Sequence, residues 1–145
     1  MRYGIFKKAA VAVIAFILSF VPVNSSGSDG EEYKFNMTYI YFGNSNSYLS
    51  QVENTKNSLN EIAPSYFDLN EDGSLKITPA ADMNFVRDMR SRGIRVVPFL
   101  SNHWNREIGR KALSNSSLLV KQLVDAVKEY ELDGVNVDIE NLTPE

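Results

Sequence analysis

Two carboxylates near the end of the chain have the residue types and the spacing for chemistry. In residues 132–141, Asn136, Asp138 and Glu140 alternate with aliphatic residues, which is the period-two pattern of a β-strand. A strand rises about 3.3 Å per residue, so the Cα atoms of Asp138 and Glu140 are expected about 6.6 Å apart on one face. Carboxylates that close can interact directly, and one of them could act as a general acid. Asp and Asn are poor strand formers, so we infer that something other than folding keeps them here.

Two other interpretations of this strand remain open. A polar strand end could hold structural hydrogen bonds, or Asp138 and Glu140 could bind a divalent metal ion. The metal hypothesis lacks further ligands nearby in the sequence, so no metal and no cofactor is expected. The aliphatic face predicts a cover of helices, so the strand would be buried on both faces, as in an α/β sheet.

Residues 133–140 resemble the signature Asp-Gly-x-Asp-x-Asp-x-Glu of glycoside hydrolase family 18, matching four of its five positions. That family includes chitinases, endo-N-acetylglucosaminidases and spore-cortex or peptidoglycan-lytic enzymes, and residues 133–142 are most similar to the last group. The resemblance implies a TIM barrel with this segment as its fourth strand. It implies Glu140 as the general acid/base and Asp138 as the residue that orients and polarises the substrate's acetamido group. Asn136 stands where most members have Asp, which weakens the inner carboxylate relay and disfavours an enzyme of crystalline chitin.

Length and composition are those of one domain or part of one. The chain has 145 residues, 43% of them hydrophobic, and no cysteine, which excludes disulfides and thiolate metal sites. Residues 1–25, with a basic start and an apolar run over 9–23, predict a secretory signal; an uncleaved anchor is the alternative, although the run is short for a membrane span. Residues 26–34 predict a flexible linker. The expected location is therefore secreted or cell-wall associated.

The charge balance after removal of the signal argues against nucleic acid as a partner. The full chain has 15 basic and 18 acidic residues, and residues 1–25 contain three of the basic ones and no acidic one. The remaining chain has a net charge of 12 − 18 = −6, which would repel a phosphate backbone. No membrane partner is expected once the signal is cleaved.

From residue 35 onward the sequence predicts alternating strands and helices. Strands are expected over residues 36–42, 62–69 and 94–100, with the acidic strand as the fourth. Helices are expected over residues 50–59, opened by a capping box at 50–53, over 83–92 and over 116–130. This alternation predicts a parallel sheet with right-handed crossovers.

The strand count covers half of the implied fold. A (β/α)8 barrel takes about 250 residues, whereas residues 35–145 supply only about its first four βα strands. The chain is therefore expected to be an N-terminal fragment, inactive by itself. The alternative is a half-barrel whose open edges pair with a second copy.

The loops that follow the strands predict the remaining site residues. Trp104, the only tryptophan, could stack on a sugar ring, and Tyr41, at the end of the first strand, could reach the barrel mouth. Together with Asn136 they are the predicted substrate-binding residues. His103, the only histidine, is expected to be merely solvated, and Tyr66 fits the core or the mouth equally well.

Residues 68–73 match the first six positions of a calcium-binding EF-hand loop, but position twelve is Pro79, which offers no side-chain oxygen. We expect a turn there instead, with Gly73 at positive φ. The sequence as a whole predicts a secreted glycosidase acting on a polysaccharide that contains β-linked N-acetylglucosamine, either peptidoglycan, spore cortex or chitin. The alternative is a lectin-like barrel that binds carbohydrate without catalysis.

Overall fold

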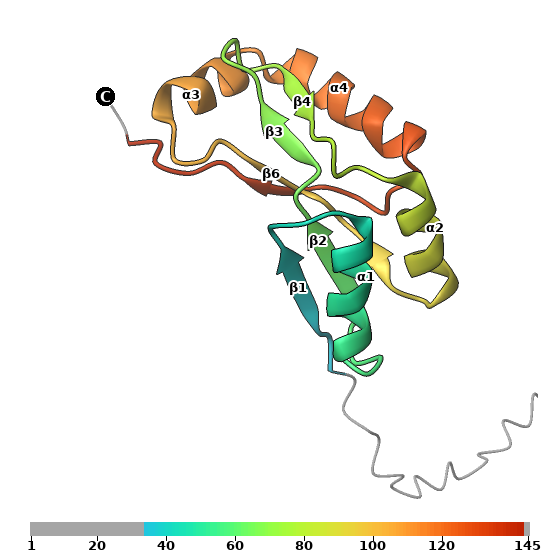
Figure 1. The fold of residues 1–145 in the computed structure, drawn as a ribbon. Helices are drawn as coiled ribbons and strands as arrows, with labels where there is room; N and C mark the ends of the chain where they lie inside the picture. Colours follow the sequence, from blue (N-terminus) through green and yellow to red (C-terminus); the bar gives the residue numbers. More distant parts are fainter. Residues whose placement is uncertain (1–33, 144–145) are drawn as a thin grey trace, which may run out of the picture. The chain divides into compact units, whose positions relative to one another are not determined.

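The computed structural model describes residues 34–143 (Figure 1). The predicted signal, residues 1–25, and nearly all of the predicted linker lie outside this part of the chain. Within it, no helix is both long enough and apolar enough to cross a membrane.

Within residues 34–143, seven short strands form two sheets. In the first sheet β1, β2 and β5 pair in parallel; in the second, β3, β6 and β7 pair in parallel and β4 is antiparallel to β3. The strands are β1 (Met37–Ile40), β2 (Glu61–Pro64), β3 (Phe67–Leu69), β4 (Leu75–Ile77), β5 (Arg95–Val96), β6 (Phe99–Ser101) and β7 (Asn136–Asp138).

Two of the predicted strands are interrupted near prolines. The strand expected over 62–69 is divided into β2 and β3 at Ser65 and Tyr66, where the Tyr66 amide turns back to the Pro64 carbonyl at 2.9 Å. The strand expected over 94–100 is divided into β5 and β6 near Pro98, which has no N–H to give to a neighbouring strand. β2 and β3 together take the place of one predicted strand, and β5 and β6 take the place of another. The parallel order of the strands is therefore that of the first four βα units of a (β/α)8 barrel. The described residues form no closed barrel.

In the part of the chain that the structure describes, four helices connect or cover these strands, namely α1 (Ser45–Asn54), α2 (Met83–Ser91), α3 (Arg106–Ser114) and α4 (Ser116–Glu129). The structure confirms the helices predicted over 83–92 and 116–130 to within one residue. The helix predicted over 50–59 is present, but it begins and ends five residues earlier, because the capping box is at Asn44 and Ser47 rather than at 50–53. The Asn44 side chain accepts from the Ser47 amide at 3.2 Å, and the Ser47 hydroxyl accepts from the Asn44 amide at 2.9 Å.

The β3–β4 hairpin contains the segment that resembles a calcium loop. Its turn confirms the predicted role of Gly73, which has φ +84°. A Cβ added to Gly73 would lie 2.4 Å from the backbone nitrogen of Ala112, so the turn is also packed directly on α3. Neither β4 nor α3 was predicted from the sequence.

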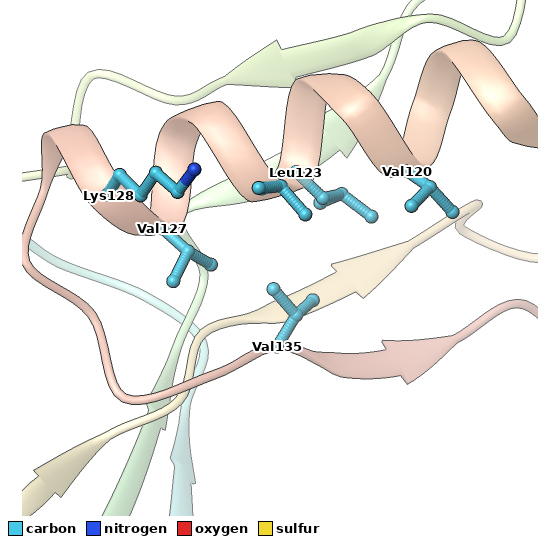
Figure 2. Close-up of a pocket in the computed structure, with 6 residues that line it drawn as sticks. Val120, Leu123, Val127, Lys128 and Val135 are labelled. Atoms are coloured by element: carbon cyan, nitrogen blue, oxygen red, sulfur yellow. The ribbon is translucent and has the colours of Figure 1, made fainter.

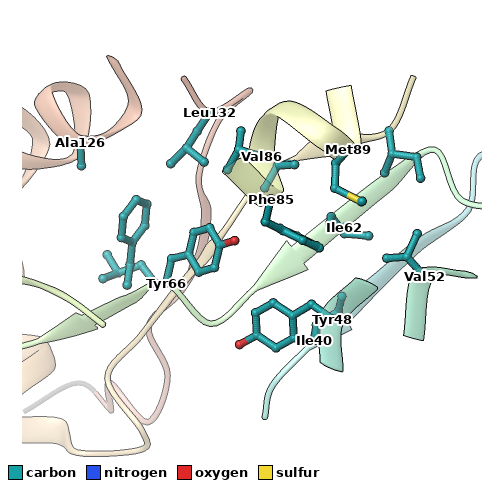
Figure 3. Close-up of a cluster of buried hydrophobic side chains, with 14 of the residues drawn as sticks. Ile40, Tyr48, Val52, Ile62, Tyr66, Phe85, Val86, Met89, Ala126 and Leu132 are labelled. Atoms are coloured by element: carbon teal, nitrogen blue, oxygen red, sulfur yellow. The ribbon is translucent and has the colours of Figure 1, made fainter. Parts of the chain in front are cut away.

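The core lies between the strands and α1, α2 and α4 (Figure 3). Tyr48 from α1 meets Phe85 from α2 edge-on, with ring centroids 5.7 Å apart, and stacks beside Tyr66 at 6.5 Å. Tyr66 is fully buried, which places it in the core rather than at the barrel mouth, and burial raises the pKa of its phenol. Its hydroxyl makes no hydrogen bond within residues 34–143.

The outer face of β7 is covered less than predicted. Val135 and Ile139 pack against the core, but Val137 between them is 60% exposed. Beside this strand, α4 and Val135 line an apolar groove of about 240 Å³, which Figure 2 shows in close-up. Its other lining residues are Val120, Leu123, Val124, Val127 and Lys128. Within residues 34–143, no strand pairs with the outer edge of β7, and the aliphatic groove beside β7 is uncovered.

Candidate active site

The acidic segment lies at the carboxyl end of the parallel sheet. Strand β7 pairs with β6 so that Phe99 lies opposite Asn136 and Ser101 lies opposite Asp138. The strand ends at Asp138 and is therefore shorter than the sequence pattern predicts; Glu140 follows it in an extended segment and is exposed. The carboxyl end of the strands is where barrel enzymes hold their catalytic groups.

Glu140 is held in place through its backbone. The buried side chain of Asn102, 3% exposed, accepts from the Glu140 amide at 2.9 Å and donates to the Glu140 carbonyl at 2.9 Å. The same Asn102 amide group also donates to the Asn105 carbonyl at 3.0 Å. Asn102 therefore joins the loop after β6 to the segment after β7 and fixes the start of the Glu140 side chain.

Helix α3 packs against the hydrogen bonds between Asn102 and the Glu140 backbone, which we call the Asn102 clamp. Its residue Gly109 lies so close to the clamp that an added Cβ would be 2.8 Å from the Asn102 Nδ2 and 3.2 Å from a methyl group of Ile139. The helix that sequence reasoning missed thus supports the residues that position Glu140.

A second set of contacts locks the same two loops together. Asn141 donates from its side chain to the Trp104 carbonyl at 3.0 Å, and Arg106 donates to the Asn141 carbonyl at 3.1 Å. His103, Trp104 and Asn141 have φ values of +47°, +63° and +61°, in the left-handed region that costs most L-residues about 1–2 kcal/mol each. Such strained backbone persists only where surrounding contacts determine it, and it gathers at functional sites.

An aromatic wall, which we define as Tyr39, Tyr41, Phe42 and Phe99, lies beside Asn136. The ring of Tyr41 stacks on buried Phe99 with centroids 5.0 Å apart, and Phe42 lies 5.1 Å from Tyr41. Tyr39 meets Phe99 edge-on at 5.7 Å, and its hydroxyl accepts from the Asn136 side chain at 2.6 Å. Tyr41 and Phe42 are 44% and 81% exposed, so their faces are available to a ligand.

The structure therefore brings Asn136 to Tyr39, which was not among the predicted site residues, rather than to Tyr41. Trp104 is 68% exposed on the loop after β6, as a stacking platform would be. No sequence pattern connected Tyr39 to Asn136, because the two are 97 residues apart.

The prediction that His103 is merely solvated is wrong. Its Nε2 lies 2.8 Å from Asp68 Oδ1, and its Nδ1 lies 3.3 Å from the Tyr41 hydroxyl. Lys76 from β4 approaches the other oxygen of Asp68 at 3.9 Å. Half of the His103 side chain is exposed, while only 19% of Asp68 is. A histidine between a carboxylate and a phenol is a connected polar chain at the edge of the site.

The two predicted catalytic carboxylates have no such partners. Within residues 34–143, no ion pair or hydrogen bond engages the carboxylate of Asp138 or of Glu140. The same part of the chain contains no group of three His, Cys, Asp or Glu side chains that could hold a metal ion. Asp138 is partly buried and Glu140 exposed, so their oxygens are open to a substrate.

Several solved structures share the fold of this chain. The spore cortex-lytic enzyme SleL of Bacillus cereus matches with a TM-score of 0.64 at 12% identity, over 76% of this chain and 28% of its own. A chitinase from Chromobacterium violaceum matches with a TM-score of 0.57 at 18% identity, over 70% of this chain and 34% of its own. A glycoside hydrolase family 18 N-acetylglucosaminidase from Paenibacillus barengoltzii matches with a TM-score of 0.56 at 14% identity, over 72% and 31%.

These likenesses establish the fold, and at such identities they establish no more. The chain spans about a third of the length of the solved structures that it matches. No family model matches the chain, and no curated protein matches its sequence.

Proposed function

We propose that this chain carries the catalytic acid of a family 18-type glycosidase that hydrolyses β-linked glycans containing N-acetylglucosamine. The observation that carries the proposal is the placement of Glu140. Its carboxylate is exposed at the carboxyl end of β7, while Asn102 holds its backbone at both the amide and the carbonyl. A general acid must be held within reach of the oxygen that it protonates, and a fixed backbone with an unengaged, accessible carboxyl group meets that geometric requirement.

In the proposed reaction, Glu140 gives its proton to the glycosidic oxygen as the bond to the anomeric carbon breaks. The acetamido carbonyl oxygen of the same sugar attacks the anomeric carbon from the opposite side, and Asp138 orients and polarises that group. Glu140, now a carboxylate, then takes a proton from the water that opens the cyclic intermediate. One protein acid and a substrate nucleophile suffice for this route, unlike the usual pair of carboxylates.

Asn136 has a different role from the carboxylate that it replaces. An amide cannot share a proton with Asp138, but it can donate a hydrogen bond, and in the structure it donates to Tyr39. We propose that Asn136 and Tyr39 together shape the floor of the sugar site beneath Tyr41. Trp104 is proposed as a stacking surface for a further sugar unit.

The proposal extends to the organisation of the protein. Residues 35–145 would form the N-terminal half of the barrel, preceded by a cleaved signal over 1–25 and a linker over 26–34, and the product would be secreted or bound to the cell wall. The matched structures are about three times longer, so most of their length has no counterpart in residues 34–143. We therefore expect activity from the complete barrel and not from this chain alone.

A substrate comparison tests the reaction class. The full-length protein is incubated with a β-linked N-acetylglucosamine tetramer and, separately, with a β-linked glucose tetramer of equal length. Because the acetamido group is the proposed nucleophile, only the first should be cleaved, and proton NMR should show the β-anomer as the initial product. Cleavage of both tetramers, or an initial α-anomer, would refute substrate-assisted catalysis.

A lectin-like function is the second candidate, and the exposed aromatic wall favours it. Tyr41, Phe42 and Trp104 offer sugar-stacking faces that need no acid. In the same experiment a lectin would bind the N-acetylglucosamine tetramer and leave it intact.

A further inference from the structure

We propose that Asp68 and His103 fix the hydrogen-bonding direction of Tyr41, so that the Tyr41 oxygen acts as an acceptor toward an N–H or O–H group of the bound glycan. This inference rests on the proposed function, since it assigns Tyr41 to that sugar site. The residues come from three separate places: Asp68 from β3, His103 from the loop after β6 and Tyr41 from the end of β1.

The first step concerns the histidine tautomer. An ionised carboxylate can only accept hydrogen bonds, so the 2.8 Å contact between Asp68 Oδ1 and His103 Nε2 requires a proton on Nε2. In a neutral imidazole the other nitrogen, Nδ1, then has no proton and can only accept. Asp68 thus selects one of the two neutral tautomers of His103.

The second step concerns the phenol. The Tyr41 hydroxyl lies 3.3 Å from His103 Nδ1, and with Nδ1 unprotonated only the tyrosine can supply the hydrogen. The hydroxyl proton is then directed to the imidazole, so the oxygen lone pairs remain for a ligand. Stacking on buried Phe99 at 5.0 Å holds the ring in that orientation.

Protonation of His103 would reverse this direction. With both ring nitrogens protonated, Nδ1–H donates to the Tyr41 oxygen and the hydroxyl proton becomes free to point elsewhere. Within residues 34–143, Asp68 from β3 is the charged group in contact with the imidazole, and Lys76 from β4 lies 3.9 Å from the far oxygen of Asp68. Asp68 and His103 are therefore positioning residues, and Tyr41 is the residue that contacts the ligand.

The backbone at this point supports the same view. His103 adopts φ +47°, a conformation unfavourable for an L-residue, and its amide donates to the Ser101 hydroxyl at 3.0 Å. The strained turn aims the imidazole between Asp68 and Tyr41.

Nitrogen NMR of the imidazole gives a test that does not depend on activity. In the full-length protein the two imidazole nitrogen signals of His103, the only histidine of these 145 residues, are identified by their absence from His103→Asn, and their shifts show which nitrogen is protonated. At a pH where the ring is neutral we expect Nε2 protonated and Nδ1 bare, with the preference lost in Asp68→Ala, which has no side-chain acceptor. A ring protonated on Nδ1, or the same spectrum in Asp68→Ala, would overturn the proposal.

Binding of the N-acetylglucosamine tetramer completes the test through a double-mutant cycle. Tyr41→Phe should weaken binding by about twofold to tenfold, the value of one hydrogen bond. The second variant is His103→Asn, because asparagine tolerates a left-handed backbone but is too short to reach both partners. It should weaken tetramer binding by a similar factor in the wild-type background and have no further effect on binding in the Tyr41→Phe background. Fully additive effects would refute positioning through Tyr41. If wild type itself bound no tetramer, the proposed function would fail, and the imidazole spectrum alone would decide the direction of the Tyr41 hydrogen bond.

Discussion

Replacing Asn102 by aspartate tests the clamp on Glu140 with almost no change in shape. Asn102→Asp keeps the acceptor for the Glu140 amide but turns the donor nitrogen into an oxygen that faces two carbonyl oxygens, at 2.9 and 3.0 Å. Two hydrogen bonds are lost, each worth about 0.5–1.5 kcal/mol net. The site is 3% exposed, so the second carboxylate oxygen is also buried without a donor, which costs about 1–3 kcal/mol or more.

Added together, these terms give a loss of about 2–6 kcal/mol in the free energy of unfolding, a large part of the 5–15 kcal/mol typical of a domain. The melting temperature of the full-length protein should fall by several degrees. Urea unfolding and a thermal melt, both at pH 7, measure the two quantities. Because protonation returns one donor to the side chain, the loss should shrink at pH 4.

Asn70→Asp is the matched control. The Asn70 side chain also donates to two acceptors, Ser74 Oγ at 3.0 Å and the Leu75 carbonyl at 3.1 Å, but it lies exposed in the hairpin turn. Solvent can replace those bonds, so we expect a loss below about 1 kcal/mol. Equal melting temperatures for Asn102→Asp and Asn70→Asp would refute the clamp as a structural element.

Three further changes probe other parts of the fold. Gly73→Ala should destabilise strongly, by about 2 kcal/mol or more in urea unfolding, because its Cβ would lie 2.4 Å from the Ala112 nitrogen and its φ is +84°. Asp82→Ala should lower the free energy of unfolding by about 1 kcal/mol at pH 7, because Asp82 caps α2. The hydrogen bond from the Ser45 hydroxyl lowers the pKa of Asp82 in the folded protein. The stabilisation by ionised Asp82 is therefore present above the ordinary carboxyl pKa, and it should vanish as the pH falls through the lowered pKa of the folded state. Tyr66→Phe should keep or raise the melting temperature, because the buried hydroxyl has no partner in residues 34–143; a clear decrease would reveal one.

The helices with strong apolar periodicity could be predicted from the sequence, and the others could not. Helices α2 and α4 present aliphatic residues at helical spacing with recognisable ends, so their bounds were predicted to within one residue. Helix α3 buries only Gly109 and Ala112, because it packs closely on Asn102 and the Gly73 turn. Small residues that allow close approach leave no apolar stripe, and the helix was missed.

The same division holds for the site. Asp138 and Glu140 lie within one short segment, so local alternation was enough to single them out. Asn102 and Glu140 are 38 residues apart, and His103 and Asp68 are 35 apart, so these pairs depend on the parallel order of β3, β6 and β7. Contacts of that kind are products of sheet register, which a single sequence does not specify.

The exposed aliphatic flank beside β7 has a consequence for handling the protein. Val137 in β7 is 60% exposed, and Val120 and Val124, which line the groove of Figure 2, are 57% and 44% exposed. Contiguous apolar surface on an open sheet edge favours association, so residues 26–145 expressed alone are expected to self-associate. A sharp, reversible melt from a clean monomer would show instead that this part of the chain is complete by itself.

The most direct test of the central claim is the hydrolysis rate of Glu140→Gln in the full-length protein. The amide keeps the size of the side chain and removes the transferable proton, and general acid catalysis is worth about 10² to 10⁴-fold. We expect turnover of the N-acetylglucosamine tetramer to fall by that factor or more while binding of the tetramer persists. Glu129→Gln, the same change at an exposed residue of α4, should leave turnover unaltered. Hydrolysis by Glu140→Gln at the wild-type rate would contradict the assignment of Glu140 as the catalytic acid.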